Sequence, residues 1–152
     1  MSGVLKAIVW GGTACAILDG LAASVQLGLK GIKPLRVWQG VASGLLGERA
    51  FRQGWASGSF GLLLHCAIAF SVATVFVEAY TQIPLLARTY WISGAAYGVL
   101  VFVVMNFVVV PLSARAKRSA SSQVMVAQLI FHVCFVGLPI AIAAKQFTFS
   151  EY

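Results

Sequence analysis

The chain has 152 residues, of which 60% are hydrophobic and only 10% are charged. Soluble globular domains carry about 25% charged residues. This composition, with a mean hydropathy of +0.90, therefore excludes an ordinary soluble domain. The net charge of +7 does not indicate nucleic-acid binding, because the basic residues stand in short connections without a folded module around them. We interpret residues 1–152 as one transmembrane domain whose first partner is the lipid bilayer.

Four apolar runs are long enough to cross a bilayer as helices: 5–29, 55–80, 91–112 and 124–144. Each reaches the ~20 residues that a helix needs to cross a hydrocarbon layer of ~30 Å. The first run is too long for a cleavable signal peptide and carries Asp19, so we expect it to remain as a span. The predicted fold is an all-α, integral membrane four-helix bundle.

Residues 30–53 form the longest connection between the apolar runs. Pro34 can open a helix here, and polar residues recur on one side of that helix while apolar residues recur on the other. This pattern predicts a short amphipathic helix in the membrane interface, between spans 1 and 2. A re-entrant loop, which Gly40 and Gly44 would permit, is the alternative, but its backbone would need more shielding than four helices supply.

Small residues at steps of three or four mark packing faces on the second and third runs. Residues spaced in this way let membrane helices approach closely. The predicted helix-packing residues are Gly54, Gly58, Gly61, Gly94 and Gly98. Because such stripes exceed what one compact bundle needs, they favour association with further copies of the chain or with other membrane subunits.

Five polar residues share a layer inside the predicted spans: Asp19, His65, Asn106, Gln128 and His132. Counting 1.5 Å per residue from the span midpoints places Asp19 and both histidines within ~5 Å of the bilayer centre. An ionisable group at this depth is costly and normally faces a partner or a wet cavity. We expect Asp19 to meet His65 in a layer that either joins the helices by hydrogen bonds or carries protons or ions.

The patterns around the histidines favour neither a metal site nor an enzyme. His65 and Cys66 are adjacent, and His132 and Cys134 are two apart, so on a helix neither pair can close on one ion. No serine or cysteine nucleophile stands beside a histidine and a carboxylate in the sequence, so we expect a non-catalytic protein without a metal. The odd number of three cysteines argues against a disulfide framework.

A faint internal repeat relates LLLHCAIAF to LIFHVCFVG. If two similar hairpins form, His65 and His132 face each other across the bundle. Two facing imidazoles are the axial ligands of haem b in electron-carrying membrane subunits, which makes such a subunit an alternative function. The sequence lacks a second ligand pair for relaying electrons, and we expect no cofactor.

The basic residues predict the orientation of the spans. Eight of them fall on one side of a four-span bundle and three on the other, and basic loops are retained in the cytoplasm. We therefore expect both termini outside the cytoplasm. The first side carries Lys30, Lys33, Arg36, Arg49, Arg52, Arg115, Lys117 and Arg118, and the second carries Lys6, Arg88 and Lys145.

The phrases QGVASGLLG and MNFVVVPLSA are the most specific part of a resemblance that extends over nearly the whole chain. The chain resembles a family of short bacterial four-span integral membrane proteins with no assigned activity. The resemblance implies a protein of the bacterial plasma (inner) membrane and transfers no catalytic residue. The leading expectation is a non-catalytic protein that acts through helix contacts, as a homo-oligomer or an accessory subunit. A small proton, ion or solute transport protein using the polar layer is the alternative.

Overall fold

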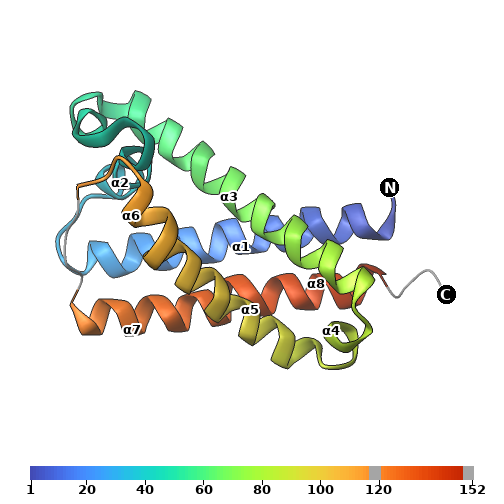
Figure 1. The fold of residues 1–152 in the computed structure, drawn as a ribbon. Helices are drawn as coiled ribbons and strands as arrows, with labels where there is room; N and C mark the ends of the chain where they lie inside the picture. The colour runs from blue at the N-terminus through green and yellow to red at the C-terminus, as the bar shows by residue number, and fades with distance from the viewer. Residues whose placement is uncertain (117–120, 149–152) are drawn as a thin grey trace.

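The computed structural model describes residues 1–116 and 121–148, which fold into helices joined by short turns (Figure 1). Four helical stretches are long and apolar enough to cross a membrane: Gly3–Gly28, Gly54–Gln82, Tyr90–Leu112 and Ser122–Thr148. No strand occurs in the described ranges. The all-α, four-helix prediction is therefore confirmed, with each span a few residues longer than or equal to its apolar run. Lys117 and Arg118, which entered the predicted charge balance, lie outside the described residues.

The first two spans are continuous helices, α1 (Gly3–Gly28) and α3 (Gly54–Gln82), and a short helix α4 (Pro84–Arg88) follows α3. The helix α1 packs against α3 on one side and against the last helix of the chain, α8, on the other. The start of α1 and the end of α8 lie at one end of the molecule, which we call the terminal end (Figure 1).

The third and fourth spans are each interrupted by a π-helical segment. The third consists of α5 (Tyr90–Val104), η2 (Met105–Val109) and α6 (Val110–Leu112), and the fourth of α7 (Ser122–Phe131), η3 (His132–Gly137) and α8 (Leu138–Thr148). Pro111 and Pro139 each stand two residues beyond a π-helical segment. Proline lacks an N–H and its ring crowds the preceding turn, so a locally wider helix accommodates it.

The hydrophobic core lies toward the terminal end. Phe76 is 2% exposed, and its ring centroid lies 4.9 Å from that of Tyr97 on α5. The Tyr97 hydroxyl donates a hydrogen bond of 2.8 Å to the Val72 carbonyl, which ties α5 to α3. Other buried members of this core are Ala7, Ala73, Val77, Tyr80, Ile140, Ala141 and Ala144.

Close glycine contacts join the helices within one chain. A Cβ on Gly94 would lie 2.7 Å from the Cβ of Ala141, and one on Gly98 would lie 2.7 Å from the Cα of Val133, so α5 and the fourth span meet backbone to backbone. Four of the five predicted packing glycines, Gly58, Gly61, Gly94 and Gly98, stand at such contacts. Gly54 does not: it begins α3 with a φ of 58°, and a Cβ there would meet nothing within 4 Å among the described atoms.

The connection between the first two spans contains the helix α2 (Pro34–Leu46) and a short 3-10 helix, η1 (Gly47–Arg52). Figure 1 shows α2 nearly end-on, lying across the ends of the spans. Its buried Gln39 donates from Nε2 to the Gly54 carbonyl at 2.9 Å, and the Ala114 amide donates to the Gly44 carbonyl at 2.8 Å. The helix α2 therefore bridges the start of α3 and the end of the third span, at what we call the cationic end.

Candidate functional site

A cavity of about 1130 Å³ lies between α1, α2, α3 and the third and fourth spans. Its volume is slightly above the ~300–1,000 Å³ that is usual for small-molecule sites. All five residues of the predicted polar layer line it: Asp19, His65, Asn106, Gln128 and His132. The structure thus brings these residues around one space rather than into one network of contacts.

The depth of this cavity can be followed along one face of α1. Cys15, Asp19, Ala23, Leu27 and Lys30 line it at steps of three or four residues, which is the spacing of one helix face. From Cys15 to Leu27 the axial rise is ~18 Å, and Lys30 follows in the turn after α1. The cavity therefore begins at the cationic end and stops against the hydrophobic core.

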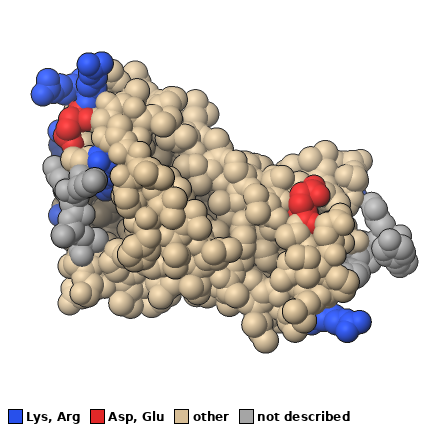
Figure 2. All heavy atoms as spheres, viewed as in Figure 1, with Lys and Arg blue, Asp and Glu red and all other residues tan. Residues whose placement is uncertain are grey.

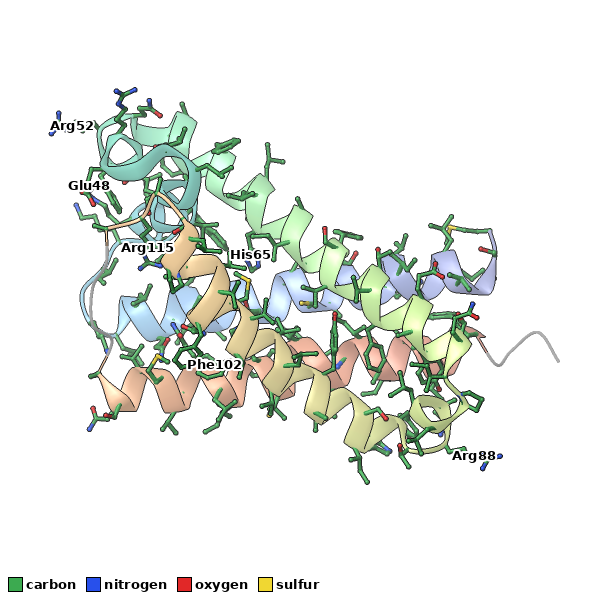
Figure 3. The ribbon with its side chains drawn as sticks, viewed as in Figure 1. Glu48, Arg52, His65, Arg88, Phe102 and Arg115 are labelled. Carbon is green, nitrogen blue, oxygen red and sulfur yellow. The ribbon has the colours of Figure 1, made fainter. Side chains whose placement is uncertain are left out.

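Four cations surround the opening of the cavity: Lys30, Lys33, Arg36 and Arg115, which we call the cationic mouth. Glu48 also lines the opening. Basic side chains gather at this end of the molecule (Figure 2), and Figure 3 shows Glu48, Arg52 and Arg115 there, with Arg88 at the opposite end. Four cations against one carboxylate make the opening attractive to an anion.

Arg36 differs from the other members of the cationic mouth in having protein contacts. Its guanidinium lies 5.4 Å from the ring centroid of Phe51, and its Nη1 donates to the Phe51 carbonyl at 3.5 Å. The side chains of Lys30, Lys33 and Arg115 form no hydrogen bond or ion pair with other residues of 1–116 and 121–148. These three cations are therefore available to a ligand.

The expected pair between Asp19 and His65 is wrong. His65 Nε2 lies 3.0 Å from the Ala16 carbonyl oxygen, to which it donates in the tautomer that protonates Nε2. Gly20 explains this choice, because its missing side chain leaves room for His65 to approach the backbone of α1: a Cβ there would lie 3.3 Å from Nε2. The Trp38 ring of α2 packs on the imidazole with a centroid separation of 5.5 Å.

Asp19 is half-buried and lines the cavity. Neither a hydrogen bond nor an ion pair joins it to any residue in the described part of the chain. A carboxylate inside a membrane span is normally paired or solvated. Since no described side chain bonds to Asp19, its carboxyl group is open to a ligand that enters the cavity.

Asn106 and His132 stand near the starts of the two π-helical segments and use their side chains alike. Asn106 Nδ2 donates to the Phe102 carbonyl at 3.0 Å, and His132 Nδ1 donates to the Gln128 carbonyl at 2.8 Å, four residues back in each case. The Phe102 ring packs edge-on against the His132 imidazole, with centroids 5.7 Å apart. Such π-helical segments occur frequently at functional sites.

Sequence reasoning missed two parts of this site. It used Lys30, Lys33 and Arg115 only as signals of orientation, although they border the cavity, and it did not single out Trp38 of the interfacial helix. It also gave no warning of the π-helical segments. The only available signal was the position of Pro111 and Pro139 inside apolar runs.

Haem b held by both histidines stays an untested alternative. His132 Nε2 has no hydrogen-bond partner among residues 1–116 and 121–148, whereas His65 Nε2 lies against the Ala16 carbonyl. The predicted pseudo-symmetry is also not seen. It would require the third span to pack on the second as closely as the first packs on the fourth. The helix α1 packs along α8 of the fourth span, whereas α5 makes few backbone contacts with α3. No cluster of three or more potential metal ligands occurs among the residues described.

No family model, no curated protein and no solved structure matches the chain. The class of the protein therefore rests on its own features. Four long apolar helices define a multi-pass membrane protein. A cavity that leads from cations at one end to polar side chains in the middle of the spans is its most distinctive feature.

Proposed function

We propose that this protein is a small, non-catalytic membrane protein of the transporter type, which binds an organic anion in its cavity. The observation that carries this proposal is the continuity of one cavity from the cationic mouth to the five polar residues inside the spans. Polar and ionisable groups inside a membrane are costly and commonly mark a solute or ion pathway. The free cations at the mouth supply attraction for an anion, and the interior supplies hydrogen-bonding groups.

We further propose that the cationic mouth faces the cytoplasm of a bacterial plasma membrane. The described cations of this end outnumber those of the terminal end, which supports retention of this end in the cytoplasm. Single cysteines at Gln53 and Gln82, both exposed and at opposite ends of α3, test this orientation in a cysteine-free background. An impermeant thiol reagent applied to intact cells should label only Gln82→Cys, and labelling of Gln53→Cys alone would reverse the orientation.

Association with further copies or with other membrane subunits stays a prediction. Its motive was a surplus of small-residue faces, yet Gly58 and Gly61 accommodate α2, and Gly94 and Gly98 accommodate the fourth span. These contacts occupy the glycine faces within one chain. The cavity therefore supports a function better than the glycine stripes do.

Ligand-dependent stabilisation tests the proposed function. The purified protein in lipid nanodiscs is heated with a panel of aliphatic carboxylates and phosphate monoesters at constant ionic strength. A ligand that binds only the folded state at 100 times its Kd stabilises that state by about 2.7 kcal/mol, which raises Tm. We expect at least one anion to raise Tm, and Arg115→Gln to reduce that shift.

Arg88→Gln is the matched control, because Arg88 is exposed at the terminal end and does not line the cavity. It should keep the full shift. Absence of any stabilising anion, or equal loss in both variants, would overturn the binding proposal. Anions that stabilise the protein are then tested for uptake into proteoliposomes, and uptake no faster than in empty liposomes would contradict the transport role.

A further inference from the structure

The charges along the cavity are separated by depth. The mouth carries Lys30, Lys33, Arg36 and Arg115, whereas the inner part contains no lysine or arginine and one carboxylate, Asp19. Asp19 lies nine residues before Gly28, the last residue of α1, which corresponds to ~14 Å along the helix axis, and Lys30 follows in the turn after α1. An anion that binds at the mouth would be repelled if it moved on to Asp19. A simple anion therefore uses only the outer part of the cavity.

The wall between these two levels is mostly apolar. Its apolar members, from α1, α2 and the third and fourth spans, are Ala23, Leu27, Val37, Val41, Val110 and Val124, and Gln26 of α1 is a polar member. Apolar surface of this kind is best covered by hydrocarbon, because a charged or strongly hydrated group would lose its hydration there without a partner. The middle of a ligand that fills the cavity is therefore aliphatic.

The inner level offers two features that suit an organic cation. Asp19 has no hydrogen-bond or ion-pair partner among the residues that the structure describes. Trp38 lines the same cavity and packs against α1 one residue further on, since a Cβ on Gly20 would lie 2.9 Å from the Trp38 ring. A cavity that offers both a carboxylate and an indole ring is a favourable environment for an ammonium group.

We propose that the ligand is bipolar: an anionic group at the cationic mouth, an aliphatic middle, and an ammonium group at Asp19. This inference rests on the proposed function and specifies the class of its ligand. The separation of the two charged levels sets the length of the molecule. After subtraction of ~6 Å for the reach of a lysine or arginine side chain, at least ~8 Å remains between the levels, which requires a chain of roughly 7 methylene groups or more.

A series of ω-amino carboxylates tests this length. The probes are ω-aminobutanoate, ω-aminooctanoate and ω-aminododecanoate, with octanoate and octylamine as controls that each lack one charge. Binding to the full chain in nanodiscs is measured by Trp fluorescence and by Tm, with empty nanodiscs to correct for partitioning into lipid. We expect ω-aminooctanoate and ω-aminododecanoate to bind more tightly than the short probe and than either one-charge control.

Variants separate the two ends of the ligand. Asp19→Asn should weaken ω-aminooctanoate by about tenfold or more, the scale of one lost charge-assisted hydrogen bond, and leave octanoate unchanged. Unchanged octanoate binding also shows that the variant is folded. Asp19→Glu, which keeps the charge, should retain preference for the amino compound. Arg115→Gln should weaken ω-aminooctanoate and octanoate alike.

The outcomes distinguish failure of this inference from failure of the proposed function. If octanoate binds as tightly as ω-aminooctanoate, or if Asp19→Asn weakens both equally, the bipolar ligand is wrong while anion binding stands. If Asp19→Asn strengthens octanoate and the amine adds nothing, Asp19 only repels anions and the inference is likewise overturned. If no probe and no other anion binds, the proposed function itself fails.

Discussion

The terminal end and the cationic end are built from equally apolar helices but are packed differently. At the terminal end, Phe76, Val77 and Ile140 are almost fully buried, and Tyr97 ties α5 to α3. At the cationic end α3 and α5 do not pack closely, and α2 spans their ends over a cavity of about 1130 Å³. Hydrophobicity therefore brings helices into the membrane but does not decide whether they close on each other.

The difference comes from the residues that face inward. Glycine and alanine at the terminal half of α5 and in α8 let these helices touch, and aromatic rings fill the remaining space. In the cationic half, polar side chains such as Asp19, Asn106 and Gln128 face the cavity instead, and no comparable filling of the space by aromatic rings occurs among the described residues. Three substitutions test this contrast, in order of decreasing expected effect.

The largest effect is expected from Gly98→Leu. A Cβ at Gly98 already meets the backbone of His132 and Val133, which cannot move aside as a flexible side chain can. Overpacking costs about 1–3 kcal/mol and occasionally more. We expect Gly98→Leu to lie at or above the upper end of this range or to prevent folding, as measured by chemical denaturation in detergent.

Gly40→Ala is the matched control for that substitution. Gly40 is helical, and a Cβ there would meet nothing within 4 Å in the described structure. Replacing a helical glycine by alanine gains up to about 1 kcal/mol. If Gly40→Ala destabilised the protein as much as Gly98→Leu, the crowded and the open glycine positions would not differ.

A smaller effect is expected from Phe76→Ala, which removes a ring from the tightly packed end. Phe76 is 2% exposed and contacts Tyr80 and Tyr97. Truncation of a buried phenylalanine costs about 3–5 kcal/mol in soluble cores, and we expect about 3 kcal/mol here. Phe131→Ala truncates a half-buried ring that lines the cavity. Its loss in the free energy of unfolding should be smaller than that of Phe76→Ala by about 1 kcal/mol or more. Equal losses in thermal unfolding would contradict the contrast between the two ends.

The smallest effect is expected from Ser57→Ala, where α3 begins beside α2. Ser57 is 2% exposed, and its Oγ donates to the Ala50 carbonyl at 2.6 Å. Loss of this hydrogen bond should destabilise the fold by about 1 kcal/mol. Ser71→Ala is the control, because Ser71 is exposed and its Oγ bonds only to the Ala67 carbonyl of its own helix. A control that loses as much stability as Ser57→Ala would show that the hydrogen bond from α3 to η1 contributes nothing.

The sequence by itself determined the class of the protein and the bounds of its spans, because both depend on local quantities: the length of an apolar run and the periodicity of a helix. It also identified five of the polar residues that line the cavity, since a polar side chain within such a run is visible without any knowledge of its neighbours. The same local information located the glycines but could not say which helix each one meets.

Only the tertiary structure decided the partners. Periodicity shows that His65 lies on an inward face, but several acceptors were in reach, and the gap left by Gly20 directs it to the Ala16 carbonyl rather than to Asp19. The cations of the connections lie around one cavity because α2 packs across α3 and also contacts α1, so that Arg36 and Lys30 line the same space. Relations between helices distant in the chain depend on packing, which no local pattern encodes.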